Sequence, residues 1–171
     1  MFIDTILQGK RILVTGGAGF IGSSVVKTLY NMGVEISVID DLSTGKESNL
    51  PEKVSFHRGS ILDEEMMGDL INNSDGVIHL AAVASVIECQ NNPRKSSEIN
   101  LQATKNITLA CRNSPRTKAI VFASSAAIYG EPSQTVITEN HPTFPLSKYG
   151  QDKLDSEKFI LSDNAFDGHL S

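Results

Sequence analysis

Residues 11–22 read Arg-Ile-Leu-Val-Thr-Gly-Gly-Ala-Gly-Phe-Ile-Gly, and this stretch decides the fold. The apolar run 12–14 predicts a buried strand, and the glycines that follow it satisfy both G-x-G-x-x-G and G-x-x-G-x-x-G. Glycines allow the backbone to turn sharply and to approach a pyrophosphate, whose charge then rests on the N-terminus of the next helix. The stretch indicates a strand, a phosphate-binding loop and a helix start, although an ordinary turn would show the same glycines.

Beyond this loop, short runs rich in Val and Ile alternate with segments of helical periodicity. The expected strands are 11–15, 34–39, 54–57, 76–80 and 118–123, and the expected helices are 21–32, one starting at 63, 96–112 and 147–161. A short helical turn is also expected before Gly9. Such alternation indicates repeated βαβ units, so the sequence predicts an α/β fold with a doubly wound parallel sheet.

An acidic residue follows the glycines at the spacing of a dinucleotide site. Asp40 ends the second expected strand, about twenty residues after the loop, where a carboxylate accepts the ribose hydroxyls of adenosine. Asp41 adds a second carboxylate, and Lys46 is the only cation nearby in the sequence. Because a 2′-phosphate would meet two carboxylates, NAD is favoured over NADP.

A second pattern lies on the last expected helix, where Tyr149 and Lys153 are one turn apart on the same face. An ammonium group and a cationic nicotinamide both favour a phenolate, so Tyr149 is a candidate general base. Ser124 and Ser125 follow the fifth strand, at the edge where doubly wound sheets bind ligands. Alone, Tyr-x-x-x-Lys is equally an aromatic residue beside a solvated charge; with the glycine loop it indicates a catalytic site.

The composition excludes several classes of protein. The 171 residues are 40% hydrophobic and 20% charged, which is typical of one globular domain. The formal net charge is −5 and no large basic cluster is present in the sequence, so binding to nucleic acid or to an acidic membrane surface is not expected. No apolar run approaches the roughly 20 residues of a membrane span, and no leader is recognised, so a cytoplasmic protein is expected. Cys89 and Cys111 lack metal-type spacing, so reduced thiols and no metal site are expected.

In combination these segments resemble the extended short-chain dehydrogenase/reductase family, and within it the UDP-glucose and UDP-N-acetylglucosamine 4-epimerases. The resemblance covers about residues 10–158. It is carried by the segment 12–22, the loop 40–45, His79-Leu80-Ala81-Ala82, the segment 124–130 and Tyr149-x-x-x-Lys153.

The resemblance implies a Rossmann domain with NAD bound along a defined set of residues. They are Gly16, Gly19, Phe20, Ile21 and Gly22 at the pyrophosphate, Asp40, Asp41, Leu42, Ser43, Thr44 and Gly45 around the adenosine ribose, Ser60 and Ile61 by the adenine, and Leu80, Ala81, Ala82 and Ala84 towards the nicotinamide. Asn100 matches a family asparagine near the cofactor, or else is a buried amide that ties down backbone. His79 is expected to be a packed, hydrogen-bonded imidazole rather than a base.

The same resemblance implies epimerisation at C4 of a nucleotide sugar such as a UDP-hexose. Tyr149 would exchange a proton with the 4-hydroxyl while C4 passes hydride to NAD, and Lys153 would bind the nicotinamide ribose. Ser125 would hydrogen-bond the reacting oxygen, with Ser124 as a second candidate, so Ser124, Ser125 and Tyr149 would contact substrate. The keto sugar would turn in the site and regain hydride on its other face.

Departures from the family pattern leave alternatives open. Ser60 stands where an aspartate is common, and Lys148 replaces a frequent proline. Ala84 replaces a lysine of some UDP-glucose epimerases, which favours the N-acetyl or broader group. Dehydratases carry an Asp-Glu pair where this chain has Ala126 and Ala127, but a related reductase or decarboxylase remains an alternative, as does a non-catalytic NAD-binding protein.

The resemblance also implies that residues 1–171 form an incomplete NAD-binding domain, truncated before the last strands and with the C-terminal substrate domain absent. We therefore expect this chain to lack epimerase activity by itself and to expose a sheet edge and an apolar face. Full-length relatives dimerise through the helices that correspond to 96–112 and 147–161, so a homodimer is expected of the full-length protein.

Overall fold

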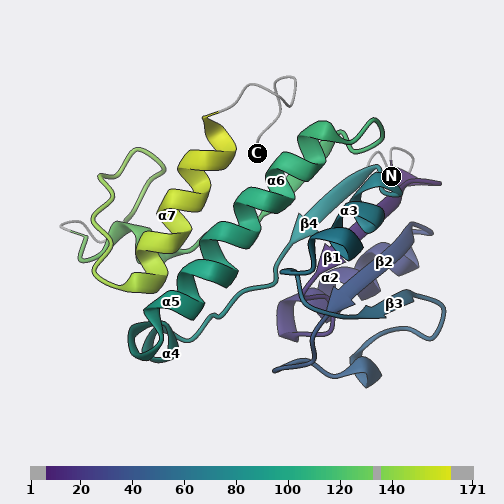
Figure 1. Cartoon of the computed structure of the whole chain (residues 1–171), viewed down its shortest axis with the longest axis horizontal. Helices are drawn as coiled ribbons and strands as arrows, with labels where there is room; N and C mark the ends of the chain where they lie inside the picture. Colours follow the sequence, from purple (N-terminus) through teal and green to yellow (C-terminus); the bar gives the residue numbers. More distant parts are fainter. Residues whose placement is uncertain (1–6, 133–135, 163–171) are drawn as a thin grey trace.

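The computed structural model describes residues 7–132 and 136–162, which form one parallel sheet flanked by helices (Figure 1). Five strands lie in the order β3-β2-β1-β4-β5. Their bounds are β1 Arg11–Thr15, β2 Glu35–Asp40, β3 Ser55–Arg58, β4 Gly76–His79 and β5 Ala119–Phe122. The strand order reverses between β1 and β4, which are hydrogen-bonded neighbours. Loops that leave the carboxyl ends of these two strands diverge, and that is where such sheets bind ligands.

The helices alternate with the strands as expected for βαβ units. The α-helices are α2 Phe20–Asn31, α3 Glu64–Asn72, α4 Val86–Asn91, α5 Pro93–Ser96, α6 Ala103–Asn113 and α7 Lys148–Leu161. Two short 3₁₀ segments, η1 Glu47–Asn49 and η3 Ala126–Tyr129, and one π-helical segment, η2 Ser97–Gln102, complete the described elements.

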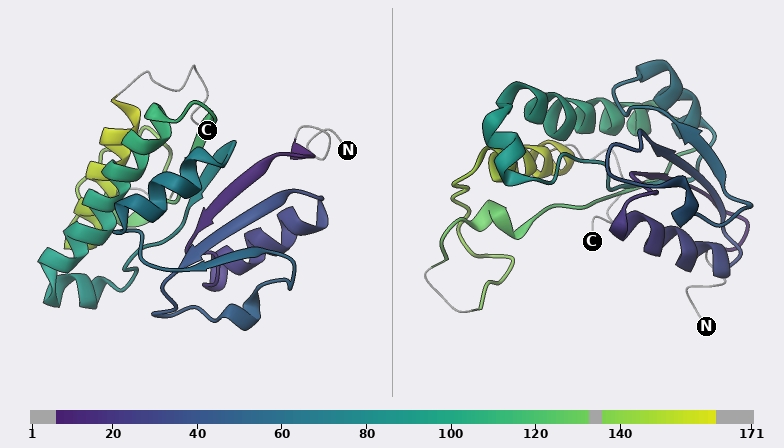
Figure 2. Two further views of the ribbon diagram at one scale, coloured as in Figure 1. Left: turned by 45° about the vertical axis from the view of Figure 1, so that its right-hand side comes forward. Right: turned by 90° about the horizontal axis from the view of Figure 1, so that it is seen from below.

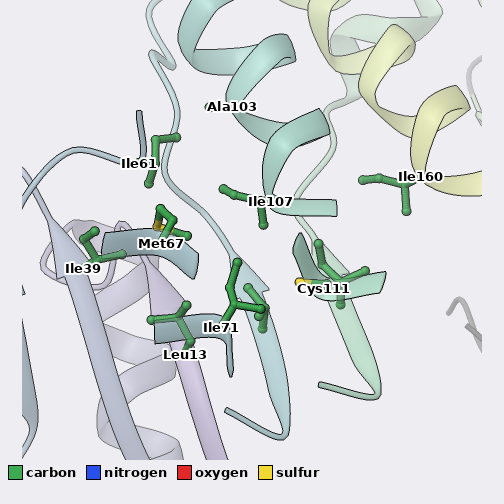
Figure 3. Close-up of a cluster of buried hydrophobic side chains, with 11 residues drawn as sticks. Leu13, Ile39, Ile61, Met67, Ile71, Ala103, Ile107, Cys111 and Ile160 are labelled. Carbon is green, nitrogen blue, oxygen red and sulfur yellow. The ribbon is translucent and has the colours of Figure 1, made fainter. Parts of the chain in front are cut away.

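Two apolar clusters hold helices against opposite faces of the sheet. On one face, Val14 and Val38 pack with Val26 of α2. On the other, Leu13 packs with Ile71 of α3 and Ile107 of α6 (Figure 3). The right-hand view of Figure 2 shows α2 below the sheet and α3 and α6 above it. The predicted fold class, a parallel sheet with helices on both faces, is confirmed.

The segment after β4 differs from the single helix expected over 96–112. Helical structure begins earlier, with α4 at Val86 and with Pro93 in the first turn of α5, where a missing N–H costs nothing. The helix then changes from α-helical to π-helical hydrogen bonding in η2 before α6 begins. Apolar periodicity does not reveal this π-helical segment, because a segment of six residues is too short to change the apolar pattern of the longer helical stretch around it.

Apolar side chains are exposed on the fifth strand and in the segment before α7. β5 is an outer strand of the described sheet, and 50% of Val121 is exposed. Phe144 and Leu146, in the segment before α7, are also exposed. Within the described residues, no helix has the length and hydropathy needed to cross a bilayer. The helical turn expected before Gly9 lies mostly outside the described residues.

Candidate active site

The glycine loop after β1 packs too closely for side chains. Gly16 has a φ of +69°, and a Cβ there would lie 2.7 Å from the Ala81 nitrogen of the loop after β4. A Cβ on Gly22 would lie 2.1 Å from the Gly16 carbonyl oxygen. Helix α2 therefore starts directly against the loop, and no side chain caps its N-terminus. Free N–H groups at a helix start, without an acidic side chain beside them, suit a pyrophosphate.

The predicted pyrophosphate residues at the helix start are open to solvent. Phe20 is 92% exposed and Ile21 is 62% exposed, although both are large and apolar. Apolar side chains exposed to this degree beside free N–H groups fit a surface that a ligand covers.

Asp40 connects the glycine loop to the loop that follows β2. Its Oδ2 accepts a hydrogen bond from Ala18 N at 3.0 Å, and its Oδ1 accepts one from Leu42 N at 2.9 Å. Leu42 has a φ of 60°, which is uncommon for a residue with a side chain and is typical of functional loops. Each carboxylate oxygen keeps a further lone pair, so the arrangement still fits acceptance of ribose hydroxyls.

The rest of this loop folds back onto Ala18. The Ala18 carbonyl oxygen accepts hydrogen bonds from Lys46 N at 3.2 Å and from Asn49 Nδ2 at 2.9 Å. Asp41 accepts from Ser43 N at 2.9 Å, which shapes the tip. The predicted adenosine loop and the glycine loop therefore form one unit.

His79, at the end of β4, is buried between two threonines. Thr104 donates its hydroxyl hydrogen to the Asn100 carbonyl oxygen, so His79 Nε2 donates to Thr104 Oγ1 at 3.0 Å. His79 Nδ1 then accepts from Thr15 Oγ1 at 2.7 Å. Burial, followed by the charge of Lys153, lowers the pKa of His79 to about 3. The predicted packed, hydrogen-bonded imidazole is confirmed.

The predicted nicotinamide segment is anchored at both ends. Leu80 N and Ala81 N donate to Thr15 Oγ1, each at 3.2 Å. Further along, Val83 N donates to Asn100 Oδ1 at 2.8 Å, and Asn100 Nδ2 donates to Val83 O at 3.1 Å. Asn100 therefore ties down backbone, and its effect on a cofactor would act through this segment.

Lys153 lies between Tyr149 and the end of β5. Its Nζ donates to the Ala123 carbonyl oxygen at 2.8 Å and lies 4.5 Å from the centroid of Phe122 and 5.9 Å from that of Tyr149. Only 3% of Lys153 is exposed. Burial lowers the pKa of this ammonium to about 8, a shift partly opposed by Cys89. A buried ammonium one turn from the phenol is the arrangement that the Tyr-x-x-x-Lys spacing predicts.

The two serines after β5 differ in their hydrogen bonding. Ser125 Oγ accepts from Ala127 N at 3.2 Å and so begins η3, which leaves its O–H able to donate. Ser124 Oγ is buried and has no partner among the described residues. A buried hydroxyl without a hydrogen-bond partner lowers the stability of a folded protein. Ser124 therefore fits a position at which a bound ligand supplies the missing partner.

The remaining predicted residues have fewer contacts. Ser60 Oγ accepts from Leu62 N at 3.2 Å, while the Ile61 side chain is buried in the core cluster of Figure 3. Contact of Ile61 with an adenine would therefore use its backbone. Ala82 and Ala84 lie in the loop after β4, and Thr44 and Gly45 lie in the loop after β2.

A family model described as the NAD dependent epimerase/dehydratase family matches residues 12–165. The chain belongs to this family. The predicted resemblance is thereby confirmed, and with it the family's dependence on NAD. The match includes every residue predicted for the site.

Several relatives of this chain are 4-epimerases. The UDP-glucose 4-epimerase of Streptomyces lividans is 39% identical over 165 residues, which cover 95% of this chain and 50% of that protein. A UDP-N-acetylglucosamine 4-epimerase from Methanobrevibacter ruminantium, solved with UDP-N-acetylmuramic acid, has a TM-score of 0.86 at 32% identity, covering 92% of this chain and 51% of that one. The UDP-glucose 4-epimerase of Thermus thermophilus, solved with NAD, has a TM-score of 0.83 at 37% identity, covering 90% and 50%. This member of the family spans about half the length of these relatives.

Two contributors to the site in this epimerase/dehydratase chain were not predicted. A Cβ on Gly150 would lie 2.5 Å from the Ala127 carbonyl oxygen, so glycine lets α7 run directly against η3. A glycine inside a helix, directly after Tyr149, is the available signal, because glycine weakens helices unless close packing requires it. Ala18 contributes only backbone atoms, and its side chain gives no such signal.

Gly22→Ala and Gly68→Ala form a matched pair of helical substitutions. A Cβ at Gly22 would overlap the Gly16 carbonyl, whereas nothing lies within 4 Å of a Cβ at Gly68 in α3. Gly22→Ala should therefore lower the free energy of unfolding by more than about 2 kcal/mol and abolish dinucleotide binding. Gly68→Ala should raise it by up to about 1 kcal/mol. Urea unfolding measures both, and equal effects would contradict the packing described.

The buried ammonium of Lys153 predicts a pH-dependent stability. Because the folded pKa of about 8 lies below the unfolded value of 10.5, the unfolded chain binds more protons between these values. The penalty for burying the charge is fully present below pH 8 and is relieved as the pH rises towards 10.5. Relative to Lys153→Met, the wild-type free energy of unfolding should increase by at most about 3 kcal/mol across this window.

Urea unfolding of both proteins from pH 7 to pH 10 measures this difference. Comparing the two proteins cancels the other titrating groups that they share. A difference that stays constant over this range would show that Lys153 is not buried as described.

Proposed function

We propose that this chain is the NAD-binding half of a nucleotide-sugar 4-epimerase whose substrate is a UDP-hexose. The observation that carries the proposal is the buried Lys153, held beside Tyr149 and against the end of β5, at the sheet edge that also carries the glycine loop. A dinucleotide loop alone would fit many functions. The phenol, the ammonium and the serines add groups able to move a proton at a sugar hydroxyl.

Each polar group has a separate task in this proposal. Tyr149 takes the proton of the 4-hydroxyl as general base and returns it later. Lys153 favours the phenolate and binds the nicotinamide ribose, while Ser125 donates its free O–H to the reacting oxygen. Bound NAD supplies the acceptor for hydride from C4. Because the hydride is returned to the opposite face of the sugar, the net change is inversion at C4.

Charge supports NAD rather than NADP at the adenosine end. Asp40 and Asp41 both lie in the loop that packs on Ala18, and the Asp40 carboxylate already accepts two backbone hydrogen bonds. A 2′-phosphate would add negative charge beside these carboxylates.

The identity of the sugar follows less directly. Relatives are named for UDP-glucose and for UDP-N-acetylglucosamine. We propose a UDP-hexose in its plain or N-acetyl form, since both kinds of relative are similar to this chain and Ala84 departs from the lysine that the family resemblance implies for some UDP-glucose epimerases. Dehydration is disfavoured because η3 presents Ala126 and Ala127 where elimination needs an acid and a base. In the full-length protein we propose a homodimer built on α6 and α7.

A chimera tests the proposal. The chain replaces the matching half of the Streptomyces lividans enzyme, of which it covers 50%. The chimera should retain NAD and interconvert UDP-glucose and UDP-galactose, whereas the 171-residue chain alone should convert neither. Tyr149→Phe should slow conversion at least about 100-fold without loss of NAD. Tyr30→Phe, on the outer surface of α2, is the matched control and should retain activity.

Three sugar assays decide the outcome: UDP-glucose, UDP-N-acetylglucosamine and a dTDP-hexose. A folded chimera that retains NAD but converts none of them contradicts the epimerase assignment. So does a Tyr149→Phe chimera that is as active as its parent.

A further inference from the structure

Asp152 is a fully buried carboxylate that the proposed chemistry does not use. Its exposure is 0%, and it lies on α7, where its carboxylate faces Ser96 of α5 and Ser97 of η2. Oδ2 accepts from Ser96 Oγ at 2.6 Å, and Oδ1 accepts from Ser97 Oγ at 3.1 Å and from Lys148 Nζ at 2.5 Å. A buried carboxylate persists only with partners of this kind.

These hydrogen bonds continue from α7 to the loop after β4. Ser96 Oγ, which donates to Asp152, accepts from Asn100 Nδ2 at 3.4 Å. The same amide nitrogen donates to the Val83 carbonyl oxygen, and Asn100 Oδ1 accepts from Val83 N. Asp152 is thus connected through two side chains to the backbone of the predicted nicotinamide segment.

A second connection runs in parallel from the same helix. Ser156, one turn after Asp152, donates to the Asn100 carbonyl oxygen at 2.9 Å. That carbonyl also accepts from Thr104, which in turn bonds His79. The π-helix η2 holds Asn100 where its side chain meets Val83 and its carbonyl meets α7.

We propose that Asp152 is a positioning residue that holds the Tyr149–Lys153 turn at a fixed place relative to the segment 80–84. Packing alone leaves a helix some freedom to slide, whereas the two hydrogen bonds that Ser96 and Ser97 donate to this buried carboxylate define the register of α7 against α5 and η2. Lys148 supplies the compensating charge and is 30% exposed. Asp152 touches neither substrate nor cofactor; it acts through the groups beside it.

This inference rests on the proposed function and makes a separate prediction about the two ends of NAD. ADP would occupy only the region of the glycine loop and Asp40, whereas NAD would also reach Tyr149 and Lys153. Displacing α7 should therefore weaken NAD and leave ADP unaffected. General loss of stability should affect both ligands alike.

Calorimetric titration of the 171-residue chain with NAD and with ADP provides the test. Asp152→Asn keeps the shape but removes charge and one acceptor, and it should raise the Kd for NAD about tenfold while the Kd for ADP changes less than twofold. Asp155→Asn is the matched control, because the Asp155 carboxylate bonds Gln151 within the same helix. It should leave both constants within about twofold.

Should circular dichroism show Asp152→Asn to be unfolded, Ser96→Ala takes its place. It leaves the carboxylate bonded to Lys148 and Ser97, and it should raise the Kd for NAD about threefold without affecting ADP. A folded variant that binds NAD normally, or that loses NAD and ADP equally, overturns the inference. A wild-type chain that binds NAD no more tightly than ADP overturns the proposed nicotinamide site itself, and the inference with it.

Discussion

The close approach between the glycine loop and the loop after β4 is the constraint on which the rest of the site depends. Gly16 lies so near the backbone of Ala81 that no side chain fits between them. This contact joins the two strands at which the sheet order reverses, and so defines the crevice at their carboxyl ends. Asp40 then attaches the loop after β2, the predicted adenosine loop, to Ala18. Thr15 attaches the predicted nicotinamide segment to β1.

Buried polar groups extend this constraint to the tyrosine helix. His79, Thr104 and Asn100 form hydrogen bonds in which each donor faces an acceptor, and the low pKa of His79 keeps that arrangement neutral. Such groups are costly to bury unless every one is satisfied, so they favour one arrangement over near alternatives. The Ser124 hydroxyl, at the end of β5, is not satisfied in this way, since it has no partner among the described residues. Its position agrees with the predicted contact between Ser124 and a bound ligand, which would supply the missing hydrogen-bond partner.

Much of the fold could be predicted because its signals are local. Apolar runs, glycines and caps indicate all five strands, the helices α2 and α7, and the start of α3 to within one or two residues. Tyr149 and Lys153 were predictable for the same reason, since four residues make one turn. The π-helix was not, because it accompanies a contact between Asn100 and Val83 across the fold. Helix α4 was missed although it has a local signal, since Ser85 caps it by accepting a hydrogen bond from Glu88 N.

Contacts between distant segments explain the other omissions. Asp152 gives no sign in the sequence that it is buried, because an aspartate on a helix is ordinarily solvated. Its partners Ser96 and Ser97 lie more than fifty residues away. The need for glycine at position 150 likewise comes from its close contact with Ala127, a residue on another element. The role of Lys148 as the charge partner of Asp152 is likewise visible only in the structure.

The central claim is that one dinucleotide spans the glycine loop, the Asp40 loop and the tyrosine helix. Amide chemical shifts of the 15N-labelled chain, followed by NMR during titration with NAD, test it most directly. The account predicts saturable shifts in three separate segments, 16–22, 40–45 and 149–153, with one common Kd. Shifts confined to other surfaces, or no shifts in any of these segments at saturating NAD, would contradict it.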